Sequence, residues 1–216
     1  MFLLLSLITI TTTTLVYSYE MLSKILLLQG RVTTGYGRGS KKLGVPTANL
    51  PHFHDLLNSN NYQRGVYFGW GTIDNDNKIY GCVANIGISP TFVGNENAIN
   101  IVEAHLLDRN SNDFYGNNLR LALVSFLRPE QKFQSFDALI NQINNDVNMA
   151  RTLRDNNNNI DDNIMIKPYN IAKDFFSKSF DNNEIKLAYK ESVIFNSNIN
   201  TNNDNNNQAV WCTVTI

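Results

Sequence analysis

The sequence predicts a mainly β protein, with strands that form a closed antiparallel sheet and a helix that packs against it. Short segments rich in β-branched and aromatic residues follow one another, and Asn, Asp and Gly residues separate them. Such short strands with turn residues between them are typical of a sandwich or a barrel. A segment with helical spacing of its apolar residues comes only after the last expected strand.

The expected strands end before Pro129, and a helix follows. The strands are expected at residues 26–32, 65–72, 79–86, 100–107 and 119–127. Polar turn residues at 74–77 and at 110–118 predict two hairpin tips. Ser135 can cap a helix that continues to residue 154. We expect one apolar stripe of this helix to pack on the sheet: Phe136, Leu139, Ile140, Ile143, Val147 and Ala150.

Length and composition indicate one domain with tails. The 216 residues are enough for one hydrophobic core, and we divide them into an apolar N-terminal segment (1–20), a core domain (21–154) and an Asn-rich extension (155–216). The net charge of −1 gives no reason to expect a nucleic-acid partner. Cys82 and Cys212 form neither a disulfide framework nor a metal cluster.

The two ends of the chain differ in character from the core. Residues 1–19 are apolar and rich in Thr, like the middle of a signal peptide without its basic start. A cleaved leader, a short anchor and a translation start at Met21 all stay open, but threonines interrupt the apolar run, so we expect no stable membrane insertion. The extension is expected to be largely disordered, with a helix or two from residues 164–195 on the outside of the core.

A basic, glycine-rich turn is suited to binding a polyphosphate. Gly35, Gly37 and Gly39 let the backbone turn its N–H groups toward an anion, and Lys41 after Ser40 adds positive charge. The spacing matches neither a Walker A loop nor a dinucleotide fingerprint. From composition alone, an ordinary turn before a strand is an equally good interpretation.

The residues after this turn offer oxygen ligands. Pro46 disfavours a helix at the residue before it, so Thr47 and Asn49 begin a strand and, by alternation, lie on one face. Hydroxyl and carboxamide oxygens are ligands that Mg²⁺ accepts beside phosphates and water. We therefore expect Thr47 and Asn49 to hold Mg²⁺, with Zn²⁺ or Mn²⁺ as alternatives.

A family resemblance gives these features a common meaning. The turn at 35–41 and the step Pro46-Thr47-Ala48-Asn49, called here the PTAN step, resemble the opening of riboflavin kinases (flavokinases), which transfer the γ-phosphoryl group of ATP to a ribityl hydroxyl of riboflavin. Later segments agree in order: 65–70, 83–87, 102–107, 113–116 and 126–133. The resemblance covers about residues 26 to 154. It implies a monofunctional enzyme with a six-stranded antiparallel Greek-key β-barrel and a C-terminal packing helix, although residues 85–151 are more similar to the kinase module of bacterial bifunctional enzymes.

The resemblance implies a role for each candidate residue. The turn from Gly35 to Lys41, together with Thr47 and Asn49, would bind ATP and its metal. Glu103 would act as general base on the riboflavin hydroxyl, because a carboxylate with a pKa of about 4.3 is ionised at neutral pH. Without the resemblance, a solvent-exposed or lysine-paired Glu103 is the better interpretation.

The flavin ring needs a flat apolar slot with a few polar edges. The resemblance places this slot between Arg128, the closing helix and a loop that contributes Asp113, Phe114 and Tyr115, and the loop could close as a lid.

Riboflavin and ATP are the partners that the resemblance implies, and we expect a monomer. Use of ATP favours the cytoplasm, while residues 1–19 leave organellar or secretory targeting open. The alternative function is a non-catalytic barrel that binds flavin or nucleotide. The joint presence of Thr47, Asn49 and Glu103 argues against that alternative.

Overall fold

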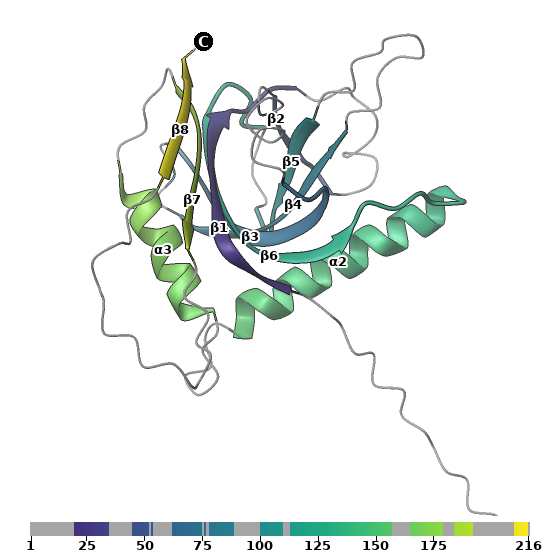
Figure 1. Cartoon of the computed structure of the whole chain (residues 1–216). Coiled ribbons are helices and arrows are strands. Elements are labelled where there is room, and N and C mark those ends of the chain that lie inside the picture. The colour runs from purple at the N-terminus through teal and green to yellow at the C-terminus, as the bar shows by residue number, and fades with distance from the viewer. Residues whose placement is uncertain are drawn as a thin grey trace, which may run out of the picture.

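The computed structural model forms one antiparallel sheet with helices on its outside (Figure 1). It describes residues 20–34, 45–51, 53, 62–74, 76, 78–88, 100–109, 113–156, 165–178, 184–191 and 210–215. In this part of the chain the elements are β1 (Glu20–Arg31), β2 (Ala48–Leu50), β3 (Gly65–Ile73), β4 (Tyr80–Ile88), β5 (Asn100–Leu106), β6 (Asn118–Pro129), α2 (Phe136–Asn156), α3 (Ile166–Ser177), β7 (Glu184–Glu191) and β8 (Val210–Thr215). No helix among these residues has the length and apolar composition needed to span a membrane.

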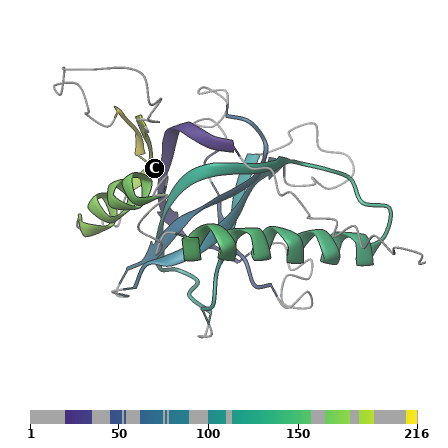
Figure 2. The same cartoon turned by 90° about the horizontal axis from the view of Figure 1, so that it is seen from below.

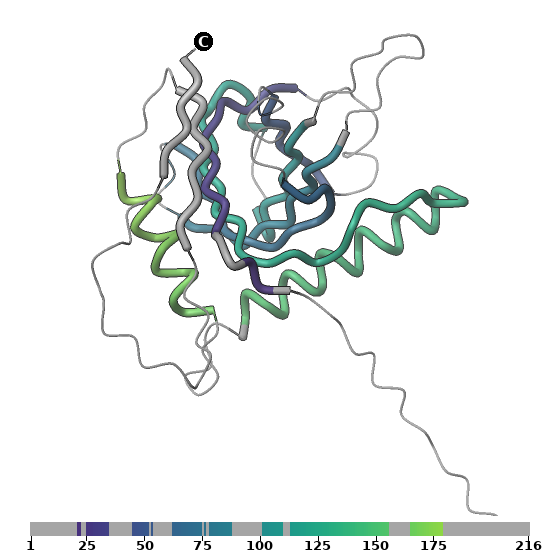
Figure 3. The backbone as a smooth tube through the Cα atoms, in the orientation of Figure 1, coloured from purple at the N-terminus to yellow at the C-terminus, as the bar shows by residue number. Residues whose placement is uncertain are grey.

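The first six strands close into a barrel (Figure 3). The order across the sheet is β2-β5-β4-β3-β6-β1-β7-β8. Strands β3, β4 and β5 form a meander and β6 returns beside β3, which is a Greek key. The ring closes where Thr33, beyond the end of β1, pairs with Asn49 of β2 and donates a 2.9 Å backbone hydrogen bond to its carbonyl. The expected mainly β barrel with a C-terminal packing helix is therefore confirmed, and β7 and β8 extend the sheet beyond it.

Two hydrophobic cores lie on the two faces of the barrel wall that these strands form. Alternation along β3 sends Tyr67 into the barrel interior and Phe68 and Trp70 to the outside, where the helices cover them. Both faces are thus buried, and every residue of β3 is buried. The helices and the barrel share the outer core, so neither layer is complete without the other.

Helix α2 starts as expected but leaves part of its stripe uncovered. The Ser135 hydroxyl accepts a hydrogen bond from the Ala138 N–H at 3.1 Å, which caps the first turn. Val147 and Ala150 are buried against the barrel, whereas Phe136 is 59 % exposed. The expectation that Phe136 packs on the sheet is wrong, because the first turns of α2 project beyond the strands (Figure 2).

Only one of the two expected hairpin tips joins neighbouring strands. β3 and β4 pair across residues 74–79, as the turn residues at 74–77 indicate. Residues 107–117 instead connect β5, which pairs with β2 and β4, to β6, which pairs with β1 and β3. The hairpin expected at 110–118 is therefore wrong. Turn residues signal a change of direction but do not say which strand pairs next.

The expectation of a largely disordered extension is wrong for three of its segments. Helix α3 packs on the outer core through Ala172 and Phe175, β7 pairs with β1 and β8 pairs with β7. The expected helix or two on the outside is therefore one helix and a strand in the described part of 164–195. The Asn-rich runs around these segments dominate the composition of the extension, so the sequence gives little sign of the helix and the strands. Residues 1–19, 157–164 and 192–209 lie outside the described residues.

A buried arginine attaches α3 to the barrel. Arg120 of β6 is 3 % exposed, and its Nε donates to the Gln29 side-chain oxygen at 2.7 Å. Its Nη1 donates to the backbone carbonyls of Phe175, at 3.3 Å, and Lys178. The last carbonyls of a helix have no partner inside the helix and carry partial negative charge, so they suit a buried cation. Arg120 therefore links β1, β6 and α3.

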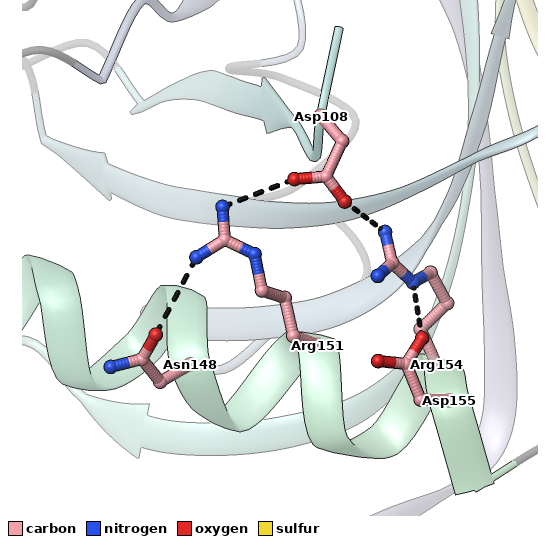
Figure 4. Close-up of polar contacts among 5 residues, drawn as sticks. All are labelled: Asp108, Asn148, Arg151, Arg154 and Asp155. Atoms are coloured by element: carbon pink, nitrogen blue, oxygen red, sulfur yellow. Dashed lines mark hydrogen bonds and ion pairs between the residues drawn. The ribbon is translucent and has the colours of Figure 1, made fainter.

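Ion pairs fasten the other helix at its C-terminal end (Figure 4). Asp108, just after β5, accepts from Arg151 at 3.1 Å and from Arg154 at 2.5 Å, and Arg154 also pairs with Asp155. These bonds hold the pKa of Asp108 below its ordinary value, with the Arg154 hydrogen bond as the largest cause. The backbone of Asp108 has φ of 56°, a conformation that Asp and Asn tolerate better than most residues.

Replacing Arg120 with Ala is expected to lower the free energy of unfolding by about 2–4 kcal/mol, because Gln29 and the α3 carbonyls lose a buried partner. Urea unfolding followed by circular dichroism measures this. The control Lys173→Ala, on the exposed face of α3, should change stability by less than about 0.5 kcal/mol. Equal stability of the two variants would show that Arg120 does not hold α3.

Replacing Asp108 with Asn keeps the backbone conformation but removes the charge. Because the folded pKa of Asp108 is lowered, its contribution is complete above the ordinary value of about 3.9 and is lost as the pH falls through the folded value. Since the pair is half exposed, we expect a loss of below about 1 kcal/mol at pH 7 that shrinks in acid. Urea midpoints of both proteins between pH 7 and pH 3 check this, and a gap that widens in acid would contradict it.

Candidate active site

Three polar residues form a row on the outer wall of the barrel. Asn49 of β2 pairs with Glu103 of β5, and Glu103 pairs on its other side with Asn85 of β4. Residues that face each other across strands have side chains on the same face, with Cβ atoms about 4.5–5.5 Å apart. Their neighbours Ala48 and Ala104 are buried in the barrel interior, so the row lies outside. The structure thus brings the expected base beside the PTAN step.

Asn85 was not singled out from the sequence. It lies in a strand without any motif of its own, and only the strand register places it beside Glu103. The row continues toward Gly87, where a Cβ atom would lie 2.1 Å from the Glu130 carboxylate and 2.7 Å from the Asn85 amide nitrogen. Gly87 therefore leaves room for Glu130 beside Asn85. The wall carries carboxylates and amides next to one another.

The PTAN step is held from two sides. The Thr33 N–H fixes the Asn49 carbonyl at 2.9 Å, and the His105 ring bonds the Pro46 carbonyl at 2.8 Å. Because a carbonyl only accepts, the Nδ1 of His105 is the donor. Burial, the largest influence, lowers the pKa of His105, so its ring is neutral at pH 7. Thr47 lies between these two supports and is half-buried.

The oxygen atoms at this corner fit a divalent metal ion that also binds phosphates. Asn49 offers a carboxamide and Glu103 a carboxylate on the same face of the wall by register, and Thr47, one residue before β2, offers a hydroxyl. Within the described ranges, no three His, Cys, Asp or Glu residues form a group that could hold a metal. Such a corner suits Mg²⁺, which takes few protein ligands and completes its shell with phosphates and water.

The glycine-rich turn lies outside the described residues, so Gly35, Gly37, Gly39, Ser40 and Lys41 stay predictions. Its two flanks are described. The pairing of Thr33 with Asn49 brings the chain just before the turn next to the chain just after it. The described residues on the two sides of the turn therefore meet at the PTAN step.

The loop before β6 is fixed to the end of β1. Gly116 donates to the Val32 carbonyl at 2.8 Å, and its own carbonyl accepts from Arg31 Nε at 2.9 Å. The φ of Gly116 is 83°, which favours glycine. Phe114 packs on the inner core while Tyr115 is 42 % exposed. The loop thus lies on the side of the wall where the glycine-rich turn begins.

Arg128 lies far from this loop. It is near the last residue of β6, whereas the loop precedes the first, and roughly 30 Å of extended strand separates them. Its guanidinium binds the carboxylate of Asp146 on α2 through Nε at 2.9 Å and Nη2 at 2.7 Å. One slot formed by Asp113, Phe114 and Tyr115 together with Arg128 is therefore not what the structure shows. Both segments flank β6, and the strand expected at 119–127 already separates them in the sequence, so the single slot rested on the resemblance alone.

Comparison with known proteins agrees with this geometry. The family model Flavokinase, described as riboflavin kinase, matches residues 22–154. The riboflavin kinases of mouse and human are each 37 % identical to the chain over 124 residues, which cover 57 % of this chain and 77 % of theirs. Both relatives are named for the kinase alone, in line with the expected monofunctional enzyme, while the expected bacterial-type second half stays a prediction.

A solved structure supports the fold independently. The riboflavin kinase from Trypanosoma brucei aligns with a TM-score of 0.53 at 23 % identity, covering 73 % of this chain and 93 % of that one. The family model spans more than half of the chain, over the segment that contains the barrel, the row and α2. The chain therefore belongs to the riboflavin kinase family.

Proposed function

We propose that this chain transfers the γ-phosphoryl group of ATP to riboflavin, giving FMN and ADP, on the barrel wall formed by β2, β5 and β4. The observation that carries the proposal is the register that sets Glu103 between Asn49 and Asn85, with Thr47 two residues before Asn49. Phosphoryl transfer needs precise positioning, neutralised phosphate charge and an acceptor oxygen that loses its proton. The row and the PTAN step supply candidates for each.

The nucleotide belongs at the PTAN step. Thr47 and Asn49 would hold the metal, and the turn from Gly35 to Lys41, whose described flanks meet here, would hold the phosphates through its backbone N–H groups. When bound, Mg²⁺ neutralises negative charge on the phosphate oxygens. ATP and a divalent metal are common to the family, and Mg²⁺ is our choice because the corner offers only hard oxygen ligands.

Glu103 is the proposed general base. As the acceptor oxygen of riboflavin bonds to phosphorus, its proton passes to a Glu103 carboxylate oxygen, and the P–O bond to ADP breaks. A carboxylate on a strand, with an amide on each side, is held more rigidly than one on a loop. This rigidity lets the riboflavin hydroxyl approach the Glu103 carboxylate in one fixed geometry.

The flavin ring belongs on the α2 side of the row. Attacking and leaving oxygens lie roughly in line in this reaction, so riboflavin must approach from the side opposite the nucleotide. That side holds Arg128, which is three strands from Glu103 through Val66 and Asn85 and which binds Asp146 of α2. The half-buried Leu139 lies two turns before Asp146, on the same face of this helix. We therefore keep Arg128 at the edge of the flavin slot. Contacts of Asp113, Phe114 and Tyr115 with the ring stay a prediction that this geometry does not favour.

The remaining expectations complete the proposal. A cytoplasmic monomer without nucleic-acid partners accords with the net charge of −1 and with a reaction that consumes ATP. Gel filtration of the native protein tests whether it is a monomer, and cell fractionation tests whether it is cytoplasmic.

The variant Glu103→Gln is expected to lower kcat by about 10²–10⁴-fold, because it removes a general base. KM for ATP and riboflavin should stay within about threefold of the wild-type values. Chromatography of FMN formed from ATP, Mg²⁺ and riboflavin measures this. Asp137→Asn, an exposed change on α2, is the control and should leave kcat unchanged. Full turnover by Glu103→Gln would remove Glu103 from this role, and a wild-type protein that binds both substrates without forming FMN would be a binding barrel.

The flavin slot is tested by two substitutions on opposite sides of the row. Leu139→Ser should raise KM for riboflavin by roughly tenfold and leave KM for ATP unchanged, because it removes apolar contact with the ring. Tyr115→Ala should leave KM for riboflavin unchanged. The reverse pattern in steady-state kinetics would place the ring at the 113–117 loop instead.

A further inference from the structure

The residue proposed to hold the metal is not part of the strand ladder. Pairing between β2 and β5 covers only Ala48, Asn49 and Leu50. Thr47 comes one residue before β2, outside the paired residues. Something besides the ladder must therefore set the direction of its hydroxyl.

A side chain from the neighbouring strand reaches this point. Because Ala48 pairs with Ala104, continuing the register sets His105 opposite Thr47. The His105 Nδ1–H donates to the Pro46 carbonyl at 2.8 Å, across 59 residues of sequence. His105 also shares the outer face with Glu103, two residues before it. One strand thus carries both the proposed base and a contact to the metal corner.

This hydrogen bond fixes more than one atom. The Pro46 carbonyl and the Thr47 N–H belong to one planar peptide unit, so holding the oxygen orients the whole plane. The proline ring already fixes φ of Pro46. With the peptide plane set as well, ψ of Pro46 is determined and the direction of the Thr47 side chain is strongly restricted. The half-buried His105 is itself packed between β4, where Val83 faces it, and the PTAN step.

We propose that His105 is a positioning residue, which aims the Thr47 hydroxyl at the metal of the bound nucleotide by holding the Pro46–Thr47 peptide. The inference rests on the proposed function, because it gives Thr47 the role of a metal ligand. His105 touches neither substrate nor metal in this role. It acts through the backbone of the PTAN step.

Three substitutions at position 105 separate positioning from simple packing. Asn places its amide nitrogen about where Nδ1 stands, whereas Gln carries its amide one carbon farther out and Leu has no donor. Calorimetric titration with Mg²⁺ and a non-hydrolysable ATP analogue measures affinity without turnover. We expect His105→Asn to bind within about threefold of wild type, and His105→Gln and His105→Leu to bind about tenfold more weakly, which is the scale of one lost hydrogen bond. Amide exchange at Thr47 should speed up in the same two variants.

The outcomes distinguish the inference from the proposed function. If wild type makes no FMN, the proposed function fails, and the calorimetry still tests His105. If wild type makes FMN and all three variants bind alike, the inference is overturned while the function stands. Should His105→Leu fail to fold, the Asn and Gln variants decide the question. Equal losses in both would show that His105 serves packing alone.

Discussion

The site depends on the closure of the barrel at one point, the pairing of Thr33 with Asn49. Strand β2 has three residues, and in the described part of the chain β5 is the one strand that pairs along its length. The 2.9 Å hydrogen bond from the Thr33 N–H to the Asn49 carbonyl ties it to the end of β1. Without that bond β2 would be a short edge strand, free to fray from β5. Closure therefore fixes Asn49 beside Glu103 and brings together both flanks of the glycine-rich turn.

The sequence predicted the features that depend on neighbours along the chain. Alternation, the proline at position 46 and the cap at Ser135 are local signals, and the structure has the expected strands, Asn49 on a strand and the helix start where these signals indicate. Asn85 could not be found in this way, because its place beside Glu103 depends on strand register. Likewise Arg128 meets Asp146 only through the packing of α2, a contact between distant segments.

The C-terminal extension is part of the sheet, because it contributes strands β7 and β8. β1 pairs with β6 on one side, and on its other side the described chain meets β2 at Thr33, beyond the end of β1, so without β7 the stretch from Lys24 to Gln29 would be an open edge. β7 covers that stretch. Arg120 also stabilises the packing of α3 on the barrel, because a buried guanidinium without its carbonyl partners is costly in free energy. The segment that matches the family therefore relies on residues after 156 for a covered edge and a paired charge.

Helix α2 restricts the motion of the outer barrel wall at the proposed active site. It is fastened at two places, through Asp146 to Arg128 at the end of β6 and through Arg151 and Arg154 to Asp108 after β5. The row around Glu103 lies on β2, β5 and β4, and Asp108 follows the end of β5, the strand that carries Glu103. Errors of about 1 Å at reacting atoms cost large factors in rate. A catalytic carboxylate on a clamped strand, with Asn49 on the short strand beside it and Thr47 just before that strand, meets that demand.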